Sequence, residues 1–178
     1  LKFDDNATAA QLKLRNTWLG NHTVEKKAKA DSADVKEIDG IINALYTVIS
    51  GPAGERDWNR FRSLFHKDAF MGAMTPKREF RKFSPEEYIQ RNSPYFLKNA
   101  FNEKEIGRTV NQFGNIAQVF TAYEYTAGNT NPKKQRGINS VELVNEQGRW
   151  WIMSVSWEEE TSSLPLPSKI IDNNKATK

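Results

Sequence analysis

The residues of this sequence best suited to move protons are a histidine and an aspartate two positions apart, His66 and Asp68. Residues i and i+2 of an extended segment project from the same side, so the Asp68 carboxylate can orient the His66 imidazole. An imidazole held in this way is a general base. The alternative is that His66 is a solvated side chain where a helix gives way to a strand.

A second candidate for proton transfer is Glu158, the first of three consecutive glutamates. If its side chain lies beside Tyr123 or Tyr125, burial raises the pKa of the carboxyl group and lets it carry protons. A tyrosine hydroxyl can then polarise a substrate carbonyl. The alternative is that the glutamate run is the solvated end of a strand.

Composition and motifs exclude several other chemistries. The 178 residues include no cysteine, which excludes disulfides, thiol catalysis and iron–sulfur ligation. The sequence has no cluster of His, Asp and Glu at metal-ligand spacing, and no glycine-rich phosphate loop or nucleophile elbow. We therefore predict no metal and no cofactor. Nothing approaches 18 consecutive apolar residues, so no membrane span is predicted.

The net charge of +4 comes from the two ends of the chain, because segment 34–160 holds 17 basic and 17 acidic residues. One basic cluster, at 77–82, alternates with Phe80 and Phe83, as in platforms that stack single-stranded nucleic acid. On a neutral body we interpret it as a solvated loop whose two rings pack into the core. No nucleic-acid partner is predicted.

The elements that must position these residues follow from a change of periodicity at about residue 102. Before it, apolar residues recur at helical spacing and predict helices at 34–51, 55–65 and 84–101, with a strand near 69–74. After it, apolar residues alternate and turn residues separate four strands, at about 103–113, 116–127, 136–145 and 149–160. This order predicts an α+β domain over 34–160, between polar tails at 1–33 and 161–178.

Three stretches make this domain similar to the nuclear transport factor 2-like superfamily, which includes SnoaL-like polyketide cyclases, ketosteroid isomerases and scytalone dehydratase. They are Asp57-Trp58 through Leu64-Phe65-His66-Lys67-Asp68-Ala69, Asn115-Ile-Ala-Gln-Val119 on to Tyr123, and Leu143-Val144 followed by Gly148-Arg149-Trp150-Trp151-Ile152. The resemblance implies a cone-shaped α+β barrel, with three N-terminal helices packed on a curved, mainly antiparallel sheet and a pocket at the open end. It also implies a homodimer through the outer sheet face.

Strand alternation and this resemblance together predict the pocket wall. Trp150, Ile152, Ser154, Ser156 and Glu158 share one face of the last strand, which the resemblance makes the inner one. The outer, dimer-forming face then carries Trp151, Met153, Val155 and Trp157. A one-residue bulge would invert any of these assignments. The predicted pocket residues are Trp58, Phe61, Phe65, Tyr88, Phe96, Tyr123, Tyr125, Asn139, Ser154, Ser156 and Glu158.

Three functions are compatible with these patterns. The first is binding of a small apolar molecule in the cone. The second is a SnoaL-like isomerase, cyclase or dehydratase that uses Glu158 or the His66–Asp68 pair as general base. The third is an interaction module that works through the sheet face or the tails. The absence of cysteine and of an initiator methionine slightly favours a periplasmic or secreted protein over a cytoplasmic one.

Overall fold

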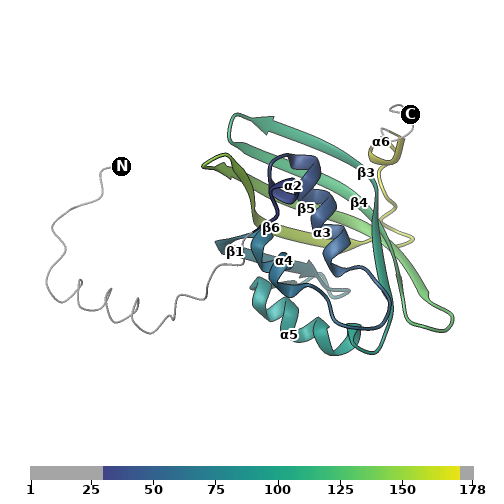
Figure 1. Cartoon of the computed structure of the whole chain (residues 1–178). Coiled ribbons are helices and arrows are strands. Elements are labelled where there is room, and N and C mark those ends of the chain that lie inside the picture. Colours follow the sequence, from purple (N-terminus) through teal and green to yellow (C-terminus); the bar gives the residue numbers. More distant parts are fainter. Residues whose placement is uncertain (1–29, 173–178) are drawn as a thin grey trace, which may run out of the picture.

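A computed structural model describes residues 30–172 (Figure 1). Most of the predicted N-terminal tail, residues 1–29, and the end of the C-terminal one, 173–178, lie outside this part. The elements are α2 (Ser32–Val35), α3 (Ile38–Ile49), α4 (Trp58–Leu64), β1 (Phe65–Met74), β2 (Phe80–Phe83), α5 (Pro85–Phe96), β3 (Phe101–Phe113), β4 (Ile116–Ala127), β5 (Lys133–Glu146), β6 (Arg149–Glu159) and α6 (Ser168–Asp172). No helix in 30–172 has the length and apolar character that crossing a membrane requires.

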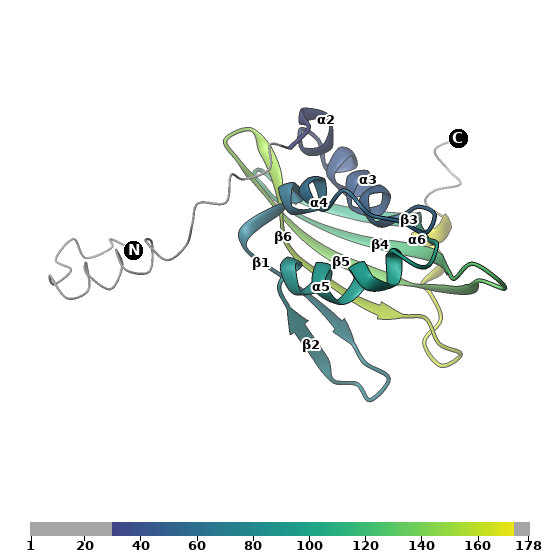
Figure 2. The ribbon, with the colours of Figure 1, turned by 60° about the horizontal axis from the view of Figure 1, so that its bottom comes forward.

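Six strands form one curved sheet in the order β2-β1-β6-β5-β4-β3. The pairing of β1 with β6 is parallel, and the other four pairings are antiparallel. Helices α3, α4 and α5 lie together on one face, which we call the inner face (Figure 2). The sheet does not close, because β2 and β3 end its order without pairing to each other. The expected closed barrel is therefore an open, curved sheet.

The helices differ from the expected set of three. The chain is extended at Glu37 (φ −125°, ψ 155°), so the predicted helix at 34–51 is two helices, α2 and α3. A Cβ at Gly40 would collide with the carbonyl oxygen of Ala33, so glycine permits α2 to lie this close to α3. The helix α5 follows the β1–β2 hairpin rather than preceding the sheet. It begins with a capping box formed by Ser84 and Glu87, at the start of the helix predicted at 84–101.

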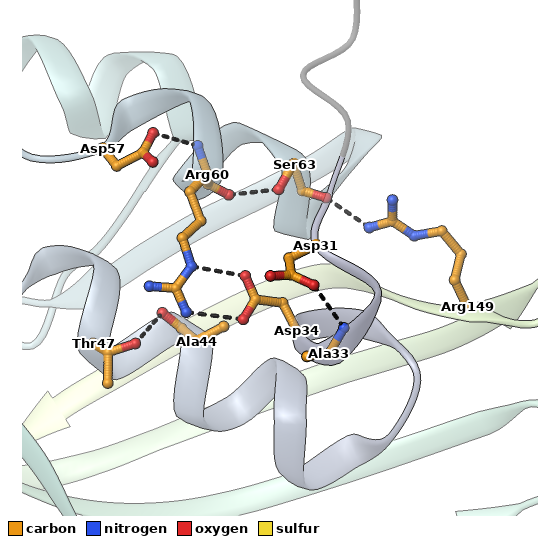
Figure 3. A network of polar contacts seen from close by, with 9 residues as sticks. All are labelled: Asp31, Ala33, Asp34, Ala44, Thr47, Asp57, Arg60, Ser63 and Arg149. Carbon is orange, nitrogen blue, oxygen red and sulfur yellow. Dashed lines mark hydrogen bonds and ion pairs between the residues drawn. The ribbon is translucent and has the colours of Figure 1, made fainter.

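A polar network ties the short helices to the sheet (Figure 3). The buried Asp34 carboxylate accepts hydrogen bonds from Nε and Nη2 of Arg60, at 2.7 and 2.8 Å. Asp57 caps α4 by accepting the backbone N–H of Arg60 at 2.8 Å. At the other end of α4, the Ser63 carbonyl accepts from Arg149 of β6 at 2.6 Å. These bonds fix α4, and with it the position of Phe61 on the inner face.

Two register shifts decide which side chains face inward. In β6, Ile152 pairs with Leu143 but Ser154 pairs with Glu142, so Met153 is an extra residue. In β3, Glu105 pairs with Tyr123 but Gly107 pairs with Ala122, so Ile106 is another. A one-residue bulge reverses the alternation of faces beyond it. Val155 and Trp157 consequently share the inner face with Ile152.

The segment after β6 lies on the opposite, outer face and runs from the end of β6 to α6 beside β3 (Figure 1). Its start is held by Glu160, which accepts the Leu166 backbone N–H at 3.0 Å and two bonds from Arg136 at 2.7 and 3.0 Å. Its end is held by the buried Ile170 of α6. A Cβ at Gly107 would collide with the Ile170 carbonyl oxygen, so α6 depends on that glycine.

Candidate functional site

A cavity of about 230 Å³ lies between the inner face of the sheet and helices α3, α4 and α5. An apolar cavity of roughly 150 Å³ accepts benzene, so this inner cavity can hold a molecule of one or two rings. Most of its wall is apolar or aromatic. It is lined by Leu45, Ile49, Phe61, Met71, Tyr88, Asn92, Phe101, Glu103, Tyr123, Tyr125, Asn139, Val155, Trp157 and Glu159.

The most unusual group in this wall is the carboxyl group of Glu103, on β3 opposite Tyr125. Burial raises its pKa from 4.5 to about 7, and a hydrogen bond from Asn139 opposes the rise. That bond, from Nδ2 of Asn139 to Oε1 of Glu103, is 3.5 Å long. It is the one side-chain hydrogen bond that the carboxylate receives within residues 30–172. Glu103 can therefore take a further hydrogen bond from a bound molecule.

A directed chain of hydrogen bonds fixes the Asn139 amide. Thr121 Oγ1 donates to Oε1 of Glu105 at 2.6 Å, so its single hydroxyl hydrogen is used there. In the 2.9 Å contact between Tyr46 Oη and Thr121 Oγ1, the tyrosine must then be the donor. Tyr46 Oη in turn accepts from Nδ2 of Asn139 at 3.2 Å. The amide nitrogen of Asn139 is thus set toward both Tyr46 and Glu103.

An ion pair anchors the far end of this chain. Oε2 of Glu105 lies 2.7 Å from Nη2 of Arg108, and Nη1 of Arg108 lies 2.9 Å from Oδ1 of Asp39 on α3. These two contacts connect the hydrogen-bond chain on the sheet to α3. Burial raises the pKa of Tyr46 above its ordinary value, and the Glu103 charge adds to this effect. Tyr46 therefore stays protonated and donates.

Two tyrosines form the part of the wall next to Glu103. The Tyr123 and Tyr125 rings stack with their centroids 6.2 Å apart. Tyr125 Oη donates to Oε1 of Glu159 at 2.9 Å, whereas Tyr123 Oη has no hydrogen bond among the described residues. A Cβ at Gly137 would collide with the Tyr123 hydroxyl, so this glycine makes room for it. Burial and the nearby Glu103 raise the pKa of Tyr123, which keeps it a donor.

The predicted pocket residues fall into three groups. Phe61, Tyr88, Tyr123, Tyr125 and Asn139 line the inner cavity. Three more rings pack behind that wall: Trp58 and Phe65 contact Phe61, at centroid distances of 5.8 and 4.8 Å, and Phe96 contacts Phe101 at 5.1 Å. The third group, Ser154, Ser156 and Glu158, lies on the outer face.

The predicted facing of the last strand is correct up to Ile152 and wrong after it, because of the Met153 bulge. Glu158 pairs with Ile138 and is exposed on the outer face, so it does not lie beside Tyr123. Val155 and Trp157, expected on the outer face, line the inner cavity. The outer face keeps only Trp151 of the two predicted tryptophans.

His66 and Asp68 lie away from the inner cavity. They are in the irregular part of β1 between Phe65, which pairs with Ile152, and Phe70, which pairs with Ser154. Nδ1 of His66 is 3.6 Å from Oδ2 of Asp68 and accepts the Asp68 backbone N–H at 3.3 Å. The Asp68 carboxylate also lies 2.6 Å from Nζ of Lys67. The His66 ring packs edge-on against Trp151. Neither His66 nor Asp68 lines the inner cavity.

Glu103 is the site residue that sequence reasoning missed. Phe113 pairs with Ile116 at the turn between β3 and β4. A regular pairing from that point would put Glu103 opposite Thr126, on the outer face. The bulge at Ile106 shifts the pairing by one, so Glu103 meets Tyr125 and faces inward. The signal in the sequence is the pair of glutamates at 103 and 105, separated by Lys104. No group of His, Cys, Asp and Glu within 30–172 could hold a metal ion.

Comparisons with known proteins identify the fold. No family model and no curated protein matches the chain. Among solved structures, a candidate dehydratase of the NTF2-like family from Streptomyces avermitilis matches with a TM-score of 0.57 at 12% identity, over 72% of this chain and 97% of that one. A cystatin-like protein of unknown function from Nostoc punctiforme matches with a TM-score of 0.55 at 12% identity, over 71% and 90%.

An NTF2-like protein from Cytophaga hutchinsonii matches with a TM-score of 0.54 at 16% identity, over 68% of this chain and 97% of that chain. The three matches cover nearly the whole of their chains, and their sequences share little with this one. They show that the chain has the nuclear transport factor 2-like fold, also described as cystatin-like. The fold hosts many functions, so the site must carry the functional argument.

Proposed function

We propose that the protein binds a small, largely apolar molecule in the inner cavity, with Glu103 and Asn139 holding its polar group. The observation that carries this proposal is a carboxyl group with one 3.5 Å side-chain hydrogen bond in a cavity walled by aromatic rings. Apolar walls with a few oriented polar groups are typical of small-molecule sites. The Tyr123 hydroxyl offers a third polar contact.

The wall also selects the charge of the ligand. Its two ionisable carboxyl groups are Glu103 and Glu159, and no lysine or arginine is among the described residues that line it. An anion would meet repulsion from both carboxylates without a compensating cation. We expect a neutral ligand with one hydroxyl or carbonyl group, about one or two rings in size.

A test uses 2-naphthol, which has two rings and one hydroxyl, as the probe. Binding is followed at pH 8 by the shift of the Asn139 side-chain amide signal in NMR spectra of the full chain. Glu103→Gln removes the anionic acceptor, and we expect at least about five-fold weaker binding. Ser140→Phe, on the outer face, should leave the affinity unchanged. Absence of binding, or equal affinity for the wild type and Glu103→Gln, would contradict the proposal.

A second candidate is proton transfer by Glu103, in the manner of an isomerase or dehydratase. The observation in its favour is the pKa of about 7, since a general base works best when its pKa is near the working pH. Glu103 would take a proton from carbon next to a carbonyl and return it. The Tyr123 hydroxyl would meanwhile donate to the carbonyl oxygen. Glu103 here replaces Glu158 and His66 as the proposed base.

Hydrogen–deuterium exchange tests this candidate without knowledge of the natural substrate. The wild type should speed exchange of the protons next to the carbonyl of 2-indanone in D₂O, measured by NMR. Glu103→Gln should lose this acceleration, whereas Glu142→Gln, an exposed carboxylate elsewhere on the sheet, should keep it. Exchange no faster than in buffer would remove the catalytic candidate and leave the binding proposal intact.

We further expect a homodimer through part of the outer face. Four apolar residues form a row across the strands near the β3–β4 turn: Phe113 pairs with Ile116, Ile116 with Val144, and Val144 with Trp151. Phe113 is 85% exposed and Ile116 is 59% exposed. Light scattering should give twice the mass of the chain, and Ile116→Lys should reduce it to the monomer. A monomeric wild type would refute this expectation.

A further inference from the structure

A second, larger cavity of about 390 Å³ lies on the outer face, under the segment that follows β6. Its floor is formed by Ser140 of β5 and Ser156 of β6, which pair with each other. Phe120 of β4 pairs with Ser140 on the other side. Two serines side by side leave a hollow that larger neighbours enclose. Phe120, Ile138, Met74 and Phe80 rise around it as walls. We call this space the outer cavity.

The roof of the outer cavity is a fixed part of the fold. It consists of Leu164, Pro165, Leu166 and Pro167, which are held on one side by Glu160 and on the other by Ile170 of α6. Proline has no backbone N–H, and the Leu166 N–H already bonds to Glu160. The roof therefore presents apolar side chains and no free backbone donor to the space below.

The charge at one end of the outer cavity is negative. Glu158, Glu159 and Glu160 all line it, and no lysine or arginine within 30–172 does. The Glu160 charge is balanced by Arg136, and Glu159 accepts a hydrogen bond from Tyr125. Glu158 has no ion pair and no hydrogen bond from any described side chain. One carboxylate thus lies at the edge of an apolar hollow without a counter-charge.

We propose that the outer cavity is a second binding site, and that it takes a small organic cation, an amine on an apolar body. The apolar body lies over Ser140 and Ser156, between Phe120 and the leucine and proline side chains of the roof. The ammonium group lies against the Glu158 carboxylate, at the edge of the cavity. A volume of about 390 Å³ is within the usual range of small-molecule sites.

The two cavities are expected to bind ligands of different charge. The inner cavity is expected to hold a neutral molecule beside a buried carboxyl group, whereas the outer cavity offers the exposed carboxylate of Glu158. An anionic ligand would face the carboxylates of Glu158 and Glu160 in the outer cavity. A second copy of the chain seated over Ser140 and Ser156, rather than on the row from Phe113 to Trp151, is the competing occupant of the outer cavity. The experiment below treats a dimer of that kind as contrary to the proposal.

The test compares three probes that share one apolar body: 4-phenylbutylamine, 4-phenylbutanol and 4-phenylbutanoate. Binding to the full chain at pH 7 is measured by NMR from the shifts of the Ser140 and Ser156 amide signals. We expect the amine to bind about five-fold more tightly than the alcohol, and the carboxylate to bind least. Glu158→Gln should bring the amine to the affinity of the alcohol.

Two variants serve as matched controls. Glu142→Gln removes another exposed carboxylate from the same sheet face and should not change amine binding. Ser140→Phe fills the floor of the cavity and should abolish binding of the amine and the alcohol, with the fold checked by circular dichroism. No shift with any probe, equal affinity of amine and alcohol, or a dimer whose contact protects these amides would each overturn the proposal.

Discussion

Replacing Glu103 with glutamine should change the pH dependence of stability in a way that follows directly from its surroundings. The carboxyl pKa is about 7 in the fold, against 4.5 for an exposed group. At about 1.36 kcal/mol for each tenfold change in proton affinity, the fold favours the protonated form by about 3 kcal/mol. The folded state therefore binds more protons than the unfolded state between these two pH values.

The sign of the effect follows from proton linkage. An acid whose pKa is raised by folding makes the protein most stable below the unfolded pKa, and stability falls as the pH rises toward the folded pKa. Glutamine cannot ionise and so does not lose this stability. The free energy of unfolding of Glu103→Gln, minus that of the wild type, should thus increase by up to about 3 kcal/mol between pH 4.5 and pH 8.

Urea denaturation at half-unit pH steps measures this difference, and contributions from the other carboxylates cancel in it. Glu142→Gln, which removes an exposed carboxylate outside the inner cavity, provides the baseline. A flat curve for Glu103→Gln over the same range would refute the reasoning, since it would mean that Glu103 titrates as an ordinary surface glutamate. The 13C signal of the Glu103 carboxyl group gives the pKa independently.

Three further predictions concern the framework of the site. Asp34→Ala removes the partner of Arg60 at a buried position and should lower the free energy of unfolding by about 2 kcal/mol in urea titrations, with Glu55→Ala as an exposed control. Gly107→Val should displace α6 and speed proteolytic cleavage after residue 160, without changing binding of 2-naphthol. Thr121→Val breaks the hydrogen-bond chain and should cost about 2 kcal/mol of stability and weaken 2-naphthol binding, whereas Thr109→Val should do neither.

The elements of the fold could be predicted because their signals are local. The capping box at Ser84 starts α5 at the predicted place, and the strand predicted at 116–127 matches β4, Ile116–Ala127. Each of these depends on a few neighbouring residues. The curved sheet with helices on one face follows from the order of such elements.

The site could not be predicted in the same way, because its residues depend on the two bulges. Extra residues at Ile106 and Met153 decide whether Glu103 and Glu158 face the inner cavity or the outer face. A bulge is set by contacts across the sheet, and neither an isoleucine nor a methionine marks one by its residue type. The break between α2 and α3 is a similar case, since it depends on the approach of Ala33 to Gly40.

The parallel pairing of β1 with β6 means that the sheet can be completed only after its last strand has been synthesised. A ribosome adds roughly 5–20 residues per second, and folding begins from the N-terminal side. The strand β1 leaves the ribosome well before β6 (Arg149–Glu159). Until β6 arrives, the edge of β1 that pairs with it is unpaired, and β2 covers only the other edge. Pairing of segments so distant in sequence slows folding. The nascent chain therefore carries an exposed strand edge and an unfinished inner cavity until the last strand arrives, and we expect chaperone contacts to concentrate in that interval.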